Sequence, residues 1–160
     1  MTLYATYFFP KDKCFVPNDK AIEEGVSFLD DAYNGDLHYR QYDITPKKYS
    51  TPVYIDSGAD FQEFSCPACK TRVTSWEDYA DWWNSEAFFW GVRDENQIIK
   101  VPCCGAELPF NQLGIGEQDV GFAMFYICVT DAGEEVSDQQ LQQLGAILGC
   151  GVRRIIQVRD

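Results

Sequence analysis

Two stretches of the chain are apolar at almost every position, without the alternation of a half-exposed strand. They are Leu3 to Phe9 near the beginning and Phe122 to Val129 in the last third. Runs of this length and composition predict strands whose two faces are both covered. The chain therefore contains two candidates for the centre of a sheet.

A helical pattern follows each apolar run. Its apolar positions recur every three or four residues, at Ile22, Val26 and Leu29 and again at Leu141, Leu144 and Leu148. The first helix begins near Asn18 and contains Gly25, which lowers its propensity. The second has a capping-box pattern at Ser137 and Gln140, and Gly149 stands where a left-handed C-cap is needed.

Each helix leads to a more polar strand. Val152 to Val158 is interrupted by arginines, while Leu37 to Tyr42 and Val53 to Ile55 are two weaker candidates. Pro46 and Pro52 are expected to bound the segment between these two candidates. Strand-helix-strand thus occurs twice, with a very apolar first strand each time. This pattern predicts an α+β, ferredoxin-like β-α-β/β-α-β sandwich whose first and third strands are central and whose other two are edges.

The middle of the chain has a different composition. We expect residues 1–60 and 115–160 to form a discontinuous sandwich, and residues 61–114 to form an inserted zinc-ribbon module. Ser75 begins a capping signature, and aromatic residues at near-helical spacing predict a helix up to Trp90. This helix contains every tryptophan, and the rings are either a surface for a partner or the cover of the metal site.

Four of the seven cysteines form two tight groups in this middle segment. The first is Cys66-Pro67-Ala68-Cys69, and the second is Cys103-Cys104 followed by Gly105. Each group follows a short extended run, as in a zinc ribbon, and four thiolates satisfy tetrahedral Zn²⁺. Such a closed shell leaves no position for a reactive water, so the predicted zinc is structural.

The second group departs from the usual spacing. A regular knuckle has a cysteine at position 101, whereas this chain has Val101 and then the adjacent Cys103 and Cys104. Two adjacent thiolates reach one ion only if the backbone bends. The alternatives are three cysteines with another ligand, such as His38, the only histidine, or four reduced buried thiols without metal.

Charge and motif content restrict the function. The formal net charge is -12 and the pI is about 4.4. Between Cys66 and Phe110, four basic residues stand against seven acidic ones, which works against phosphate contacts. Phosphate-loop, dinucleotide and Ser-His-Asp motifs are missing, so we expect a protein that is not an enzyme.

The beginning of the chain lacks the basic region of a secretory signal, and no apolar run reaches 18 residues. We therefore expect a cytoplasmic protein without membrane contact, where clustered thiols stay reduced and hold metal. The scattered Cys14, Cys128 and Cys150 are interpreted as small buried apolar residues.

Several motifs resemble those of a family of uncharacterised bacterial zinc-ribbon proteins, of which some members are labelled sugar ABC transporter ATPase. The resemblance rests on the Cys-Pro-x-Cys pair, Pro102-Cys103-Cys104-Gly105, Phe110 to Leu113 and Gly121 to Phe125, and covers roughly residues 61–127. Met124 stands where the family has arginine, and Gln112 where it has aspartate. The resemblance implies a zinc-binding cytosolic protein and brings no established activity.

The expected function is therefore a protein–protein interaction module held together by structural zinc. Its sharper form is an acidic immunity protein that neutralises a basic toxin, since opposite charge speeds such an encounter. The alternative is a zinc-ribbon regulator associated with nucleic acid or the transcription machinery. Its basic face would come from Lys47 and Lys48 or from Arg153, Arg154 and Arg159.

Overall fold

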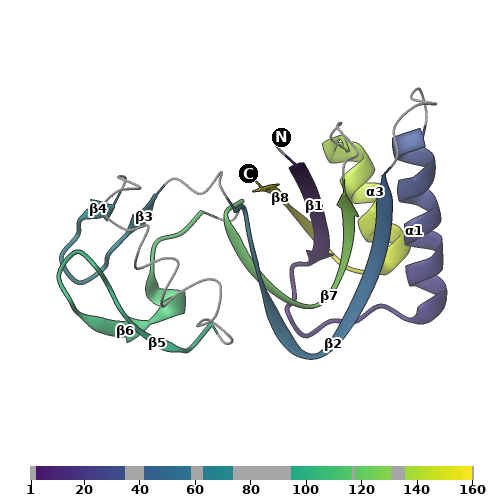
Figure 1. Cartoon of the computed structure of the whole chain (residues 1–160). Coiled ribbons are helices and arrows are strands. Elements are labelled where there is room, and N and C mark those ends of the chain that lie inside the picture. Colours follow the sequence, from purple (N-terminus) through teal and green to yellow (C-terminus); the bar gives the residue numbers. More distant parts are fainter. Residues whose placement is uncertain are drawn as a thin grey trace.

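The computed structural model describes the chain over residues 3–34, 42–58, 63–73, 95–116, 118–130 and 136–159. A four-stranded antiparallel sheet carries two helices on one face, and two short hairpins lie beside it (Figure 1). The α+β class expected from the sequence is confirmed. In chain order the elements are β1 Leu3–Pro10, α1 Asp19–Asn34, β2 Asp43–Asp56, β3 Phe64–Ser65, β4 Arg72–Val73, β5 Ile98–Lys100, β6 Glu107–Pro109, η2 Phe110–Gln112, β7 Val120–Thr130, α3 Asp138–Leu148 and β8 Val152–Arg159.

The strand order in the sheet is β2-β7-β1-β8, so the two apolar runs form the central strands as expected. Phe8 of β1 packs beneath the helices, Phe9 packs on the opposite face, and neither ring is exposed. In β7 every second residue from Gly121 to Val129 is buried, and the residues between them are half-buried. Both faces at the centre of the sheet are therefore covered.

Helices α1 and α3 lie side by side on the sheet (Figure 1) and share its largest core cluster. The buried members of this cluster are Phe8, Ile22, Leu29, Tyr33, Phe125, Ile127, Val129, Val136, Leu144, Leu148 and Val152. Neither helix in the described part of the chain is long and apolar enough to cross a membrane.

The predicted helix ends are confirmed. Asn18 Oδ1 accepts the Ala21 N–H at 2.8 Å and caps α1. Ser137 and Gln140 form the reciprocal capping box of α3, and Gly149 closes that helix at φ 81°. Gly25 allows α1 and α3 to pack closely, because a Cβ there would lie 3.0 Å from Leu148 Cδ2 of α3. This role in packing is separate from its low helix propensity.

Strand β2 differs from the expected pattern. The prolines do not bound a separate segment, because β2 runs without interruption from Asp43 to Asp56. It is an edge strand that pairs with β7, with a register shift between Lys48 and Val53. An edge strand tolerates Pro46 and Pro52, since one side of its backbone needs no donor. The candidate at 37–42 lies mainly outside the described residues.

The sheet curls until the far end of β2 reaches β8. Ser57 O accepts the Val158 N–H at 3.0 Å, and Ser57 is only 2% exposed. Gly58 has φ 61°, and a Cβ there would lie 2.4 Å from the Val158 carbonyl oxygen, so a side chain does not fit. Inside the curl lies a second small core of Phe9, Ile55, Ala123 and Ile155.

The curled end of the sheet also carries the contact with the hairpins. Tyr54 of β2 and Phe122 of β7 form edge-on ring pairs with Phe110, at centroid distances of 6.1 and 6.0 Å. Lys13, before α1, forms an ion pair with Glu95, before β5. The hairpins are therefore fixed on the sheet by an aromatic cluster and by one pair of opposite charges.

Candidate metal centre

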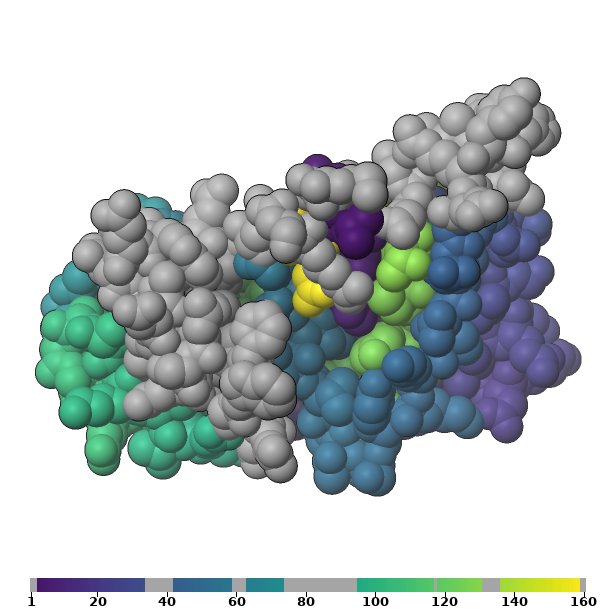
Figure 2. Space-filling model, viewed as in Figure 1, coloured from purple at the N-terminus to yellow at the C-terminus, as the bar shows by residue number. Residues whose placement is uncertain are grey.

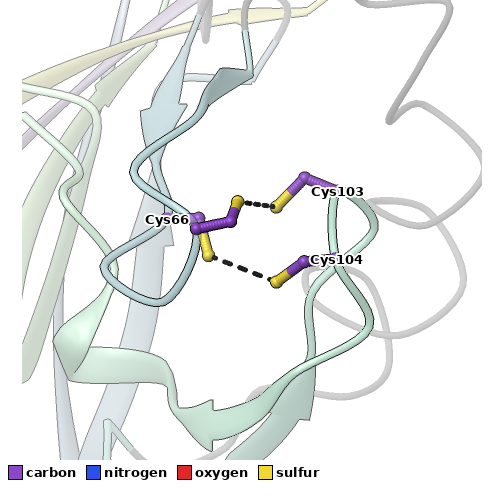
Figure 3. A group of neighbouring side chains, drawn as sticks. Cys66, Cys103 and Cys104 are labelled. Carbon is purple, nitrogen blue, oxygen red and sulfur yellow. Dashed lines mark hydrogen bonds between the residues drawn. The ribbon is translucent and has the colours of Figure 1, made fainter.

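The four cysteines of the middle segment meet at one point. Their sulfur atoms all lie within 4.8 Å of one another. Cys66 Sγ is 3.8 Å from Cys104 Sγ, and Cys69 Sγ is 3.5 Å from Cys103 Sγ (Figure 3). A zinc–sulfur distance of about 2.3 Å in a tetrahedron places neighbouring sulfurs about 3.8 Å apart. The four residues are thus close enough to hold one metal ion, and all seven cysteines of the chain are free thiols.

These thiols lie on two turns that have the same pattern of backbone hydrogen bonds. In the first cysteine turn, residues 66–71, the Cys66 N–H donates to Thr71 O and the Lys70 N–H donates to Cys66 O, both at 2.9 Å. In the second cysteine turn, residues 101–106, the Val101 N–H donates to Ala106 O and the Gly105 N–H donates to Val101 O, both at 3.0 Å. Each turn connects the two strands of one hairpin, β3–β4 or β5–β6.

Both turns require a left-handed residue at the same place. Gly105 has φ 73°, as its lack of a Cβ permits. Lys70 has φ 63° and is the only residue with a Cβ in this conformation within the described part of the chain. A Cβ makes that conformation unfavourable by about 1–2 kcal/mol. The first turn therefore holds a strained lysine where the second has a glycine.

Hydrogen bonds to sulfur complete the equivalence of the turns. The Cys69 thiol receives hydrogen bonds from the Thr71 hydroxyl and backbone N–H, which lower its pKa to about 6. The Cys104 sulfur receives a backbone hydrogen bond from Ala106, which lowers its pKa, but desolvation and the neighbouring sulfurs raise it further, so the net shift is upward. Backbone donors of this kind orient and stabilise thiolate ligands.

Electrostatics within the cluster favour a cation. Desolvation, together with hydrogen bonds and charge from Cys69 and Cys66, raises the pKa of Cys103 to about 12. Burial and the neighbouring sulfurs therefore favour the protonated form of Cys103 and Cys104, whereas the lowered pKa of Cys69 favours its thiolate. A divalent ion removes this conflict, because its charge stabilises all four thiolates at once.

The cluster is buried on one side only. Cys66 is 1% exposed and belongs to the core of the hairpins, whereas the other three cysteines are exposed. That core consists of Phe64, Cys66, Val73, Ile99, Val101, Leu108, Phe110 and Leu113. Residues from both hairpins contribute to it, so the core and the cysteine cluster join the same two hairpins.

The structure brings together all four cysteines that the sequence singles out, including the adjacent Cys103 and Cys104. The alternative ligand His38 and the predicted helix from Ser75 to Trp90 lie outside the described residues. Cys128 and Cys150 are half-buried, but Cys14 is exposed, so its interpretation as a buried apolar residue is wrong. Cys14 lies in the connection between β1 and α1, outside both elements.

One residue at the cluster was not expected from the sequence: Thr71 donates hydrogen bonds to the Cys69 sulfur. Val101, at the position where a regular knuckle has a cysteine, takes the place in the second turn that Cys66 has in the first. The sequence agrees with this correspondence, because Pro67 and Cys69 are repeated after 35 residues as Pro102 and Cys104.

Comparisons of this chain with protein-family models, with curated proteins and with solved structures find no match. The resemblance to bacterial zinc-ribbon proteins therefore stays a prediction from the motifs.

Proposed function

We propose that this chain is a non-enzymatic protein–protein interaction module stabilised by one structural Zn²⁺. Cys66, Cys69, Cys103 and Cys104 are its proposed ligands. The observation that carries the proposal is the all-thiol composition of the cluster, at separations that suit a tetrahedron. Four sulfur ligands in that arrangement favour zinc among divalent ions and leave no open position for a reacting water.

A structural ion explains how the hairpins keep their shape. Their strands are only two or three residues long, and eight residues of the described part of the chain are buried in their shared core. Structural zinc contributes about 10–16 kcal/mol in zinc-finger peptides at neutral pH. A contribution of that order stabilises hairpins that are too short to be stable alone.

We propose the ferredoxin-like sandwich for the sheet and its helices, residues 1–60 and 115–160, and the inserted zinc ribbon for residues 61–114. The strand order β2-β7-β1-β8, antiparallel throughout, supports the first assignment, as do two helices on one face. The position of both hairpins between β2 and β7 supports the second. Reduced thiols agree with a cytoplasmic location.

A groove between α1 and β2 supports the interaction role. Figure 2 shows these two elements side by side on one face, in purple and blue. The groove has a volume of about 600 Å³, and Ile22, Val26 and Ile44 supply apolar lining. Two polar contacts connect the elements along it: Tyr42 donates to Asp30 at 2.6 Å and Lys48 to Asp19 at 2.6 Å.

The charge of the groove selects the kind of partner. Glu23, Asp30 and Asp43 line it, and none of the lining residues that the structure describes is basic. With a net charge of -12, the whole molecule attracts cations toward this acidic face. A partner segment with a lysine or arginine next to an apolar side chain complements both properties. A basic toxin presents such segments, and this supports the immunity-type form of the proposal.

The nucleic-acid alternative has less support. Lys48 is paired with Asp19, and Arg154 is paired with Asp138 at 3.3 Å. Arg153 donates to the Val120 carbonyl and stacks on the Phe9 ring. These contacts direct three of the five candidate cations toward the protein itself.

Elemental analysis of the purified chain tests the metal half of the proposal. We expect one zinc per chain in the wild type and loss of that zinc in a Cys69→Ser variant. The helices and sheet, which have their own core, should keep their far-ultraviolet circular dichroism in the variant. A wild type that is folded, carries no zinc and takes up none from zinc sulfate contradicts the proposal.

Capture from a lysate of the native host at low salt tests the partner half. The wild type should retain a basic protein, and a Glu23→Lys/Asp43→Lys variant should lose it. Glu24 provides the matched control, because it is an exposed carboxylate of α1 outside the groove. A Glu24→Lys variant should bind like the wild type. Equal capture by all three forms, or capture of acidic proteins alone, contradicts the proposed role of the groove.

A further inference from the structure

The two cysteine hairpins are one structural unit present twice, at an interval of 35 residues. The cross-strand pair Phe64–Val73 of the first corresponds to Ile99–Leu108 of the second, and Ser65–Arg72 corresponds to Lys100–Glu107. The two hydrogen bonds within each turn recur at the same interval, as does the left-handed residue. Few of the side chains are identical, so the equivalence is carried by the backbone.

Burial follows the same repeat. The side chains of Phe64 and Val73 enter the shared core, and so do their counterparts Ile99 and Leu108. The first residue of each turn is also buried, whereas the third, fourth and fifth residues of both turns are exposed. The first five positions of the turn therefore have the same degree of burial in both hairpins.

The ligand positions do not follow the repeat. Counting from the first residue of each turn, the first turn has thiols at positions 1 and 4, and the second has them at positions 3 and 4. Position 1 of the second turn is Val101, which is 1% exposed, as is Cys66. Position 3 of the first turn is Ala68, which is exposed, as is Cys103.

We propose that one ligand of this metal site has been transposed within the second turn. Cys103 supplies from the exposed position 3 the thiolate that Cys66 supplies from the buried position 1 of the first turn. Val101 marks the ligand position that was vacated. This inference rests on the metal site proposed above and assigns it a second, unused ligand position at residue 101.

The transposition has a physical reason to work. A buried position in the hairpin core accepts valine as well as cysteine, because both side chains are small and apolar. An exposed position 3 accepts a thiol without loss of packing. The second turn can therefore move its ligand by two residues while every hydrogen bond of its backbone is kept.

A compensating substitution tests the proposal. Cys103→Ala alone should remove the tightly bound zinc. The double variant Val101→Cys/Cys103→Ala should regain one zinc per chain, since it restores thiols at positions 1 and 4 of both turns. The matched control Val101→Ser/Cys103→Ala has nearly the same shape without the sulfur, and it should stay without zinc.

Cobalt(II) added to each metal-free variant reports on the ligand set independently of zinc content. The wild type and the restored double variant should both give the intense sulfur-to-cobalt and ligand-field bands of a tetrahedral four-thiolate site. Cys103→Ala and the serine control should give weaker, shifted bands. Circular dichroism of the helices verifies that each variant is folded.

Each failure has a separate meaning. A wild type without any metal overturns both the metal site and this inference. A wild type with one zinc, together with a folded Val101→Cys/Cys103→Ala variant without zinc, overturns the transposition alone. Full zinc and an unchanged cobalt spectrum in Cys103→Ala also overturn it, because Cys103 is then no ligand.

The single variant Val101→Cys provides a second measurement should the double variant not fold. In its zinc-bound form the buried thiol at position 101 should replace Cys103, which should then react with an alkylating reagent. In the zinc-bound wild type Cys103 should be protected. Equal protection of Cys103 in both proteins contradicts the proposal.

Discussion

Replacing Gly105 with alanine tests whether metal binding depends on the left-handed residue of the second cysteine turn. Gly105 has φ 73°, and the nearest atom to a Cβ there is Lys100 Cε at 3.6 Å. The substitution adds no clash, so its effect comes from the backbone conformation alone, about 1–2 kcal/mol. If the turn forms only around the ion, this energy lowers zinc affinity about 5- to 30-fold.

Gly149 provides a control with the same backbone property away from the metal. It closes α3 at φ 81°, and a Cβ there meets no atom within 4 Å. Gly149→Ala should therefore lower the free energy of unfolding by about the same 1–2 kcal/mol. Zinc affinity should not change, because the end of α3 does not contribute to the cysteine cluster.

Competition with a chromophoric zinc chelator at fixed pH and salt measures the affinity, and urea denaturation measures the stability. The two variants should differ in zinc affinity: it should be weaker in Gly105→Ala and unchanged in Gly149→Ala. Unchanged affinity in Gly105→Ala would falsify the dependence of the metal site on this turn. So would an equal loss of affinity in both variants.

Further predictions concern strain, packing, capping and pH. Lys70→Gly should raise zinc affinity up to about fivefold in the same chelator assay, because it removes about 1 kcal/mol of left-handed strain. Gly58→Ala should lower the free energy of unfolding in urea by about 2–5 kcal/mol, since its Cβ would collide with a backbone carbonyl of β8. Ser137→Ala should lower the same quantity by about 0.5–2 kcal/mol through loss of the capping box. Zinc affinity should rise with pH below 8, by at least about 100-fold per unit, because Cys103 and Cys104 have raised pKa values and release protons on binding. An affinity that is independent of pH over this range contradicts the raised pKa values.

Much of the sheet and its helices could be predicted because local signals agreed with the packing. The apolar run of β1 and the capping box of α3 specify their elements within a few residues, and both are confirmed. From the sequence alone, Gly25 indicates only a weak point in helix α1. In the structure, Gly25 permits the close approach of α3 to α1. Sequence periodicity could not predict this, because it contains no information on the distance between two helices.

The prolines of β2 show where a local rule gave the wrong boundary. Proline interrupts a strand when both sides of the backbone are paired, and this assumption separated Val53 to Ile55 from the preceding residues. Since β2 is an edge strand, Pro46 and Pro52 fit within it. Whether a strand lies at an edge depends on the order of the whole sheet, which the sequence of one strand does not contain.

The cysteine cluster was predictable as a set of residues but not as an arrangement. Spacing and ligand chemistry selected Cys66, Cys69, Cys103 and Cys104, and these four come together. Knuckle spacing marks position 101 as a ligand position, but the correspondence of Val101 to Cys66 rests on the hydrogen bonds that the two turns share. A repeat of backbone structure is difficult to recognise from the sequence when few of its side chains are identical.

The two prolines of β2 also affect how copies of the chain behave toward one another at high concentration. An unpaired strand edge invites another chain to add to the sheet, which begins aggregation. Pro46 and Pro52 each remove a backbone donor, and the exposed Lys47 would bring a positive charge close to the like charge of a second copy paired at this edge. The two prolines that interrupt the strand pattern of β2 thus oppose edge-to-edge pairing between copies of the chain.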